Sequence, residues 1–356
     1  MKGMTTGPTL IIASWLSMLV MTPRSPTKLA HVALLATGGI IAGVPREGRR
    51  SSSVAGHFAV EDMLRALPQL RDVANLSGEQ VVDVESQTMS DAVWIKLGKR
   101  VNEVLREGKA DGVVITHGTD TLEETAYFLS LIAKSDKPIV MTGSVRPATA
   151  IGADGPANLY NAVALAASSE AKGRGVLVTL NDEVHFAREV EKANSTQLDT
   201  FQSPNRGRAG IINAGRPKLW SHLEANYGLH SEFSVEGLDA LPRVEIVYSY
   251  ASAKRDLVDA LVDKGVRGIV LAGVGDGNTT DELLAGLRDA ARKGVVVVRS
   301  SRTGSGVVAR NVEVSDDELG FVASEELNPA KSRVLLMLAL TKSKDLATIQ
   351  SFFERY

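Results

Sequence analysis

The sequence has no cysteine and only six histidines. The absence of cysteine excludes disulfide bonds and thiolate chemistry, although it neither requires nor forbids an oxidising compartment. The histidines are scattered, and none falls in the spacing of a metal site. The formal net charge is only −2, which gives no reason to expect binding to nucleic acid or to an anionic membrane surface. The sequence therefore predicts a protein without a bound metal and without a thiol-based reaction.

Two nucleotide-binding patterns are also missing. A sharp turn at Thr37-Gly38-Gly39 follows the apolar residues 31–36, but the dinucleotide pattern G-x-G-x-x-G is not met there. No P-loop pattern occurs in the chain, and there is no internal repeat or low-complexity tract. We therefore expect no cofactor, and no macromolecular partner other than further copies of the chain.

The apolar run at residues 10–21 is too short for a comfortable transmembrane helix, which needs about 20 residues. It follows the single basic residue Lys2 and precedes a polar stretch, an order that resembles a secretory signal. Residues 1–27 are therefore predicted to be a signal peptide, cut near residues 22–28, and the protein to be periplasmic or secreted. The alternative is an upstream translation start or a disordered tail on a cytoplasmic protein.

A length of 356 residues and a hydrophobic content of 44% are typical of a globular protein with about two domains. Apolar runs alternate with helical patterns, which predicts an α/β fold with a mainly parallel sheet. The predicted strands are 31–36, 81–85, 138–142, 175–180, 244–250, 268–272 and 295–300, with one more beginning at residue 113; the predicted helices include 91–105, 281–293 and 329–340.

The alternation breaks between residues 217 and 241, where no steady period is present. We therefore predict a larger N-terminal domain at 28–216, a linker at 217–242 and a smaller C-terminal βαβ domain at 243–356. The helix at 329–340 is apolar on nearly every face, which predicts burial, with a position between subunits as one option.

The residues that carry chemistry are expected in the stretch VVITHGTDTLEET, residues 113–125. Its β-branched start predicts a buried strand, Gly118 allows a turn, and the acidic residues after Thr121 are typical of the first turn of a helix. Thr119 and Asp120 should then lie at the carboxyl end of a strand, where open α/β sheets bind ligands. An ordinary strand-to-helix turn with a capping side chain explains the same pattern.

The stretch ITHGTDTLEETAYF resembles the second signature of the L-asparaginase/glutaminase family, the threonine-dependent amidohydrolases. Similar blocks follow in the family's order from residue 29 to residue 356. They are LLATGG (34–39), GEQVVDVESQ (78–87), KPIVMTGSVRP (137–147), ADGPANLYNAV (153–163), AGVGDGN (272–278), VRSSR (298–302) and LNPAKSRVLL (327–336). The resemblance implies hydrolysis of the side-chain amide of asparagine or glutamine, with release of ammonia.

The resemblance also implies a set of site residues. Thr119 corresponds to the second catalytic threonine, Asp120 to the residue that holds the substrate α-ammonium, and Lys192 to the catalytic lysine. Ser86 and Gln87 correspond to the groups that bind the α-carboxylate, and hydroxyl and amide groups are suitable donors for that anion. Composition alone would make Lys192 a solvated surface charge. His117 is expected to be structural.

Two further residues are implied to act on a neighbouring subunit. Asn278 corresponds to a residue that reaches the neighbour's substrate, and Glu313 to an acidic partner of the α-ammonium. A Gly-rich turn and a surface acid are the ordinary explanations of the same residues. If both correspondences hold, the site needs an oligomer, and the family is typically a homotetramer.

The sequence departs from the family at two places. The family has its nucleophilic threonine directly after the Gly pair, whereas this chain has Ile40, which cannot attack a carbonyl. The mobile lid of the family carries a tyrosine near the position of Ser53, whereas residues 46–53 contain none.

Three interpretations of these departures stay open. The first is an asparaginase-like amidohydrolase with reduced or rerouted activity, in which Thr119 or a water attacks. The second is a member of the family that binds an amino acid without turnover, and the third is a recent single-codon change in a working enzyme. An unrelated periplasmic amino-acid-binding module is a further alternative, although simple binding does not need the Thr119, Asp120 and Lys192 set.

Overall fold

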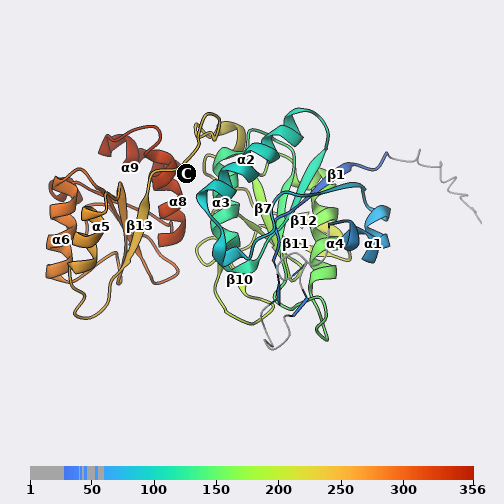
Figure 1. Ribbon diagram of the computed structural model, residues 1–356, viewed down its shortest axis with the longest axis horizontal. Coiled ribbons are helices and arrows are strands. Elements are labelled where there is room, and N and C mark those ends of the chain that lie inside the picture. The colour runs from blue at the N-terminus through green and yellow to red at the C-terminus, as the bar shows by residue number, and fades with distance from the viewer. Residues whose placement is uncertain (1–27, 40, 42–43, 46–52, 55–59) are drawn as a thin grey trace, which may run out of the picture.

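The computed structural model describes residues 28–39, 41, 44–45, 53–54 and 60–356. Two sheets organise these residues, and helices cover both faces of each sheet (Figure 1). The predicted fold class is confirmed, because a large, mainly parallel sheet occupies the N-terminal half and a smaller parallel sheet the C-terminal half. The expected signal peptide, residues 1–27, lies outside the described residues.

The large sheet has the strand order β12-β11-β8-β7-β6-β5-β1-β4. Neighbours from β7 to β4 are parallel, whereas β8, β11 and β12 add an antiparallel edge. The strands are β1 (His31–Ala36), β4 (Asn75–Gln80), β5 (Gly112–Thr116), β6 (Ile139–Thr142), β7 (Val176–Leu180), β8 (Glu183–Phe186), β11 (Gly210–Asn213) and β12 (Arg216–Leu219).

Helices bury both faces of this sheet. The helices α2 (Asp91–Arg106) and α3 (Leu122–Ile132) cover one face, and α1 (Val60–Ala66) and α4 (Gly155–Ala166) cover the other (Figure 1). In β5, Val113 and Ile115 join the core under α2 and α3, while Val114 joins the core under α4. This alternation explains why the strand is apolar at every position. Ser90 caps the start of α2, since its Oγ accepts from the N–H of Val93.

The strand predicted at 81–85 is wrong. The strand precedes this segment in the sequence: β4, at Asn75–Gln80, pairs with the whole length of β1. Beyond Gln80 the partner strand has ended and turns at Gly38, so residues 81–85 continue as a loop; Val84 N–H still donates to the Thr37 carbonyl at 3.0 Å. Because β4 is an edge strand, its apolar alternation is weak and the sequence pattern misses it.

The small sheet has the order β13-β14-β15-β16, and all its strands are parallel. They are β13 (Val244–Tyr248), β14 (Gly268–Gly273), β15 (Val296–Ser301) and β16 (Phe321–Ala323). The helices α5 (Asp256–Asp263) and α6 (Asp281–Arg292) cover one face, and α8 (Pro329–Ala339) and α9 (Leu346–Arg355) the other. The short helix α7 (Asp316–Leu319) precedes β16, and the remaining two-residue strands are β2 (Val44–Pro45), β3 (Ser53–Val54), β9 (Glu191–Lys192) and β10 (Phe201–Gln202).

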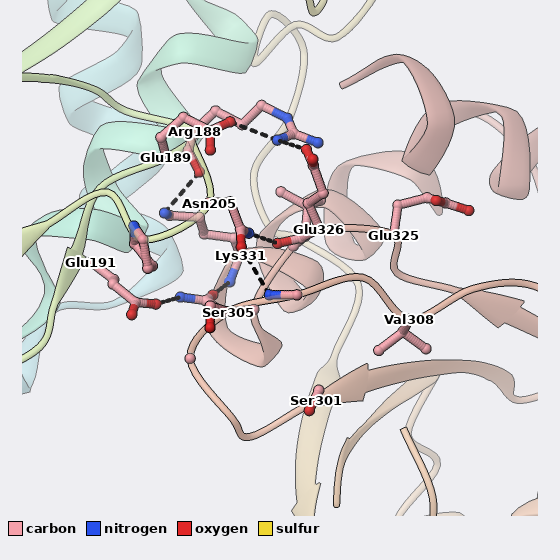
Figure 2. Close-up of a pocket in the computed structure, with 15 residues that line it drawn as sticks. Arg188, Glu189, Glu191, Asn205, Ser301, Ser305, Val308, Glu325, Glu326 and Lys331 are labelled. Carbon is pink, nitrogen blue, oxygen red and sulfur yellow. Dashed lines mark hydrogen bonds and ion pairs between the residues drawn. The ribbon is translucent and has the colours of Figure 1, made fainter. Parts of the chain in front are cut away.

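Helix α8 joins the two halves. It packs on the small sheet and against α3 of the N-terminal half, so that one hydrophobic core continues from β5 to β14. The apolar character of α8 is therefore explained by burial within one chain. Ion pairs add to this junction. Glu326 accepts from Arg188 at 3.0 Å beside a small cavity (Figure 2). Glu326 also accepts from Arg206 at 2.7 Å.

The strand β12 begins at Arg216 and pairs with β11, so residues 217–219 of the predicted linker lie at the edge of the large sheet. The exact domain boundaries stay a prediction. Among the described residues, no helix combines the length and the apolar character that crossing a membrane requires.

Candidate active site

The candidate site lies where β1 and β5 end side by side. After β1 the chain turns through Gly38 and Gly39, whose φ angles are +107° and +88°. A Cβ atom built on Gly39 would lie 2.6 Å from the backbone nitrogen of Gly118, so only glycine allows the two turns to approach this closely. The site is thus at the carboxyl edge of the parallel strands, where α/β sheets bind ligands.

Thr119, Asp120 and Lys192 come together at this edge. Thr119 and Asp120 lie in a single 3-10 turn, Thr119–Thr121, that leads into α3. Lys192 arrives from β9, and its Nζ donates to Thr119 Oγ1 at 2.9 Å and to Asp120 Oδ1 at 2.6 Å. Thr119 is buried, whereas the Asp120 side chain is 58% exposed. The predicted catalytic set therefore forms one contact group with an opening to solvent.

The group combines a hydroxyl, an amine and a carboxylate in direct contact. An ammonium that donates to the Thr119 oxygen can stabilise negative charge that develops there or exchange a proton with it. Asp120 balances the charge of the lysine. Among the described residues no cluster of histidine, aspartate and glutamate is arranged to hold a metal ion.

Ser86 joins the same group. It is buried, its Oγ accepts from the N–H of Asp120 at 3.2 Å, and its carbonyl accepts from Thr121 Oγ1 at 2.7 Å. A Cβ on Gly118 would lie 2.6 Å from Ser86 Oγ, so a glycine is needed for this approach too. The neighbouring Gln87 is exposed, and its Nε2 donates to Glu85 at 2.5 Å.

His117 is structural in its contacts, as the sequence predicts. Its Nδ1 lies 2.7 Å from the Gly118 carbonyl, which can only accept, so Nδ1 carries the proton. Its Nε2 therefore accepts from Thr125 Oγ1 at 2.9 Å, and the same hydroxyl oxygen accepts from Trp94 Nε1 at 2.8 Å. Complete burial lowers the pKa of His117 to about 4, so the ring is neutral at pH 7.

Glu123 is a contact of the site that sequence reasoning missed. Its Oε2 accepts from the backbone N–H of Lys192 at 2.5 Å. The sequence indicates only an acidic residue in the first turn of a helix, which is common wherever a helix begins. Nothing in its local pattern distinguishes a carboxylate that holds a distant strand from one that faces solvent.

Asn278 and Glu313 are not brought to this group. Asn278 ends a tight turn after β14, where its backbone pairs with Val274, and Glu313 is exposed in the loop before α7. Within the described part of the chain, neither residue has a hydrogen bond or an ion pair with Thr119, Asp120 or Lys192. Their proposed action on a neighbouring subunit stays a prediction.

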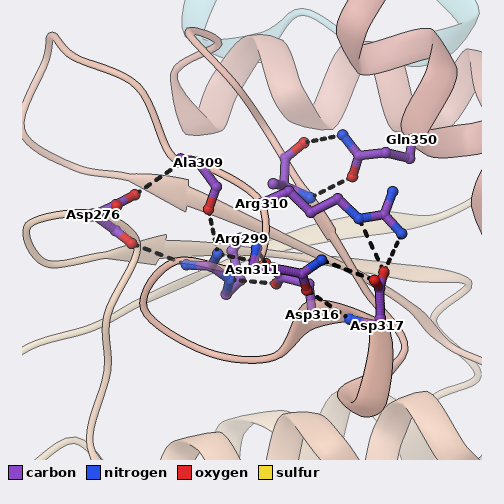
Figure 3. A network of polar contacts seen from close by, with 9 residues as sticks. Asp276, Arg299, Ala309, Arg310, Asn311, Asp316, Asp317 and Gln350 are labelled. Atoms are coloured by element: carbon purple, nitrogen blue, oxygen red, sulfur yellow. Dashed lines mark hydrogen bonds and ion pairs between the residues drawn. The ribbon is translucent and has the colours of Figure 1, made fainter.

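One buried guanidinium connects the two segments that carry Asn278 and Glu313 (Figure 3). Arg299 in β15 donates to the carbonyls of Asp276 at 2.9 Å and Ala309 at 3.1 Å. It also forms a bidentate pair with Asp316. The turn before Asn278 and the loop before Glu313 are therefore held by the same side chain.

The departures at the family's nucleophile and lid fall largely outside the described residues. Ile40 and residues 46–52 are not described, and Ser53 is described only by the backbone of β3. In the sequence, position 40 is isoleucine, whose side chain has no hydroxyl.

Family models match both halves of the chain. The model described as "Asparaginase, N-terminal" matches residues 31–224, and the model described as "Glutaminase/Asparaginase C-terminal domain" matches residues 243–353. The two matches together span both sheets and the segment that bears Lys192.

Curated relatives agree with these matches. The chain is 48% identical to "Probable L-asparaginase periplasmic" of Haemophilus influenzae over 92% of this chain and 93% of the relative. It is also 48% identical to "L-asparaginase 2" of Escherichia coli, over 92% and 94% of the two chains. It is 43% identical to "Glutaminase-asparaginase" of Pseudomonas fluorescens biotype A, over 94% and 92%. With these matches and the grouping of Thr119, Asp120 and Lys192, the chain belongs to the asparaginase family.

Proposed function

We propose that the protein is an amidohydrolase that converts asparagine to aspartate and ammonia, with glutamine as a second substrate. Relatives that are named L-asparaginase and glutaminase-asparaginase support this substrate class. The observation that carries the proposal is the contact of Lys192 Nζ with both Thr119 Oγ1 and Asp120 Oδ1, since binding alone does not require a lysine on a buried hydroxyl.

In the proposed reaction an oxygen nucleophile adds to the amide carbon and the C–N bond breaks. The leaving nitrogen takes a proton and departs as ammonia, and water supplies the OH group of the new carboxyl. Asp120 accepts a hydrogen bond from the substrate α-ammonium, and Ser86 and Gln87 donate hydrogen bonds to the substrate α-carboxylate. Lys192 donates to the Thr119 oxygen and exchanges the proton there.

The residue at position 40 limits the rate in this proposal. Removal of the nucleophile from a catalytic unit typically costs on the order of 10⁵–10⁶ in rate, while substrate binding can survive. With Ile40 in place, the attacking oxygen is Thr119 Oγ1 or a water beside Lys192. We therefore expect weak turnover by the native chain.

A second candidate function is binding of an amino acid without turnover. The observation that favours it is Ile40, since the residues proposed to hold the α-ammonium and the α-carboxylate are all present while the usual nucleophile is not. In this case Asp120, Ser86 and Gln87 would keep their positions and no ammonia would be released.

The proposal includes assembly and export. We propose domains at 28–216 and 243–356 joined by the linker 217–242, and a homotetramer in which Asn278 and Glu313 complete the site of a neighbour. A negative charge at Glu313 suits the cationic amine of the substrate. The name of the Haemophilus influenzae relative, which includes the word periplasmic, supports export behind a signal peptide at 1–27.

The test is ammonia release from asparagine and from glutamine by purified protein that begins at Lys28, beside its Ile40→Thr variant. We expect weak or no release by the native chain and a large gain in the variant. Strong native turnover that Thr119→Val abolishes would identify Thr119 as the attacking group. If neither protein releases ammonia and calorimetry shows tight binding of the amino acid, the proposed hydrolase function is overturned and binding without turnover is supported.

A further inference from the structure

The block LNPAKSRVLL, residues 327–336, starts helix α8, and its sequence gives no role in the site to the lysine that it contains. In the structure its lysine, Lys331, is 2% exposed although it carries an amine. The Nζ atom donates to the carbonyl of Arg188 at 2.8 Å and to that of Val190. A buried lysine is costly unless its donors are satisfied. Through these two hydrogen bonds, the Lys331 amine of the C-terminal half holds the segment that leads directly into Lys192.

Asn328 makes a second connection from the same helix end. Its Oδ1 accepts from the N–H of Lys331 at 2.9 Å and so caps α8. Its Nδ2 donates to Glu123 at 3.2 Å and to Glu191 at 3.3 Å. Aspartate caps helices as well as asparagine does, but it cannot donate to two carboxylates. The amide is therefore needed for a reason that capping does not explain.

Glu123 completes the connection to the site. One oxygen of its carboxylate accepts a hydrogen bond from Asn328 Nδ2, and the other accepts one from the backbone N–H of Lys192 at 2.5 Å. Glu123 belongs to the first turn of α3, directly after the turn that holds Thr119 and Asp120. Lys192 is thus held at its backbone by Glu123 and at its Nζ by Thr119 and Asp120.

The space around Lys331 does not suggest a ligand site. The cavity beside it is about 20 Å³, which is room for about one water molecule. Lys331 and Glu191 line it (Figure 2). Groups that leave so little space hold chain segments to one another.

We propose that Lys331, Asn328 and Glu123 are positioning residues that set the place of Lys192 against Thr119. The C-terminal half of a subunit thereby controls the active site of its own N-terminal half. None of the three touches the substrate in this proposal. The inference rests on the proposed function only in giving Lys192 a part in catalysis; the placement itself can be measured without turnover.

The test uses Asn328→Asp in the Ile40→Thr background, because this change keeps the helix cap, removes the amide donor and adds a repelling charge. Asp345→Asn is the matched control: Asp345 caps α9 by accepting from the N–H of Thr348, far from the site, and the swap is the reverse one. Three quantities are measured: the kcat and the KM for ammonia release, and the rate at which acetic anhydride acetylates Lys192, which is followed by peptide mass spectrometry.

We expect Asn328→Asp to lower kcat by about tenfold to a hundredfold with little change in KM, because a small misplacement of a catalytic group has effects of this size. Acetylation of Lys192 should become several-fold faster, since its amine loses fixed contacts. Asp345→Asn should change none of the three quantities. Glu123→Gln keeps one acceptor oxygen. Its kcat and its rate of Lys192 acetylation should therefore lie between those of the Ile40→Thr protein and those of Glu123→Ala.

The proposal is overturned if Asn328→Asp and Glu123→Gln both leave the acetylation rate of Lys192 at the control value. Lys331→Met should accelerate acetylation as well, with the exposed Lys342→Met as its control. If Lys331→Met does not fold, the Glu123 and Asn328 variants still decide the question. If the Ile40→Thr protein releases no ammonia, the proposed function fails, while the acetylation rates still test the placement of Lys192.

Discussion

Arg299 and Asp316 form a bidentate ion pair in which neither side chain is exposed to solvent. The Nε to Oδ1 distance is 2.6 Å and the Nη2 to Oδ2 distance is 2.8 Å. Removal of one partner of such a pair leaves a buried charge without compensation. We expect Arg299→Met to lower the free energy of unfolding by about 3–5 kcal/mol, measured by urea denaturation.

Two further variants distinguish the effect of breaking the buried Arg299–Asp316 pair from the effect of removing any surface charge. Arg310→Met breaks the exposed pair with Asp317 and should cost less than about 1 kcal/mol. The double variant Arg299→Met, Asp316→Leu should recover much of the lost stability, because apolar side chains can replace a buried pair. A double variant as unstable as Arg299→Met would show that the other contacts of the two side chains, those of Arg299 with Asp276 and Ala309 and that of Asp316 with the N–H of Asn311, matter more than the charge of Asp316.

Lys192→Met keeps the length of the side chain and removes the amine from Thr119 and Asp120. In the Ile40→Thr background we expect kcat to fall by about 10²–10⁴, the usual contribution of a positioned proton-transfer group. The exposed Lys172, which forms an ion pair with Asp136 at 3.4 Å, provides the control Lys172→Met, with unchanged kcat. An equal fall in both variants would contradict a catalytic part for Lys192.

Gly39→Ala places a Cβ atom 2.6 Å from the nitrogen of Gly118, at a φ of +88°. We expect a loss of stability larger than that of Gly173→Ala, which has a φ of +72° and where, among the described residues other than its two chain neighbours, no atom lies within 4 Å of the added Cβ. The control should cost about 1–2 kcal/mol from backbone strain alone. Thermal unfolding of the two variants gives the comparison, and ammonia release in the Ile40→Thr background should fall only for Gly39→Ala.

The buried histidines predict a loss of stability in acid. The pKa of His117 and that of His185 are lowered from 6.5 to about 4, in both cases chiefly by burial. Between these pH values the unfolded chain binds protons that the folded chain does not. The stabilisation is therefore complete above pH 6.5 and is lost as the pH falls toward 4, by about 3 kcal/mol for His117. Burial raises the pKa of Glu124 to about 7, which acts in the opposite direction over the same range.

The contribution of His117 is isolated by comparing the native protein with His117→Gln, since the effect of Glu124 is common to both. We expect the slope of unfolding free energy against pH, between pH 6 and 4.5, to be smaller in the variant by about 1.4 kcal/mol per pH unit. Equal slopes would mean that His117 binds a proton in the folded protein near its ordinary pKa.

Local patterns predicted much of this protein. Strands buried on both faces, such as β5 and β14, are recognisable because every position is apolar, and the helix starts at Ser90, Thr280 and Asn328 follow from capping chemistry. The sequence pattern misplaces the edge strand β4, because pairing with β1 defines this strand and its own residues show little alternation. The resemblance of ITHGTDTLEETAYF to the family signature identifies Thr119 and Asp120 as candidate site residues from the sequence alone.

What the order of residues specifies directly is chemical: a chain without thiols, a Thr-Asp pair after a buried strand, and an isoleucine where the family has its threonine. Distances between remote segments are absent from it. Lys192 reaches Thr119 because β9 is held by Glu123, and Glu123 meets Asn328 because α8 packs on α3. These contacts join residues up to 205 positions apart. They depend on the burial of a core shared by the two halves, which no local pattern encodes.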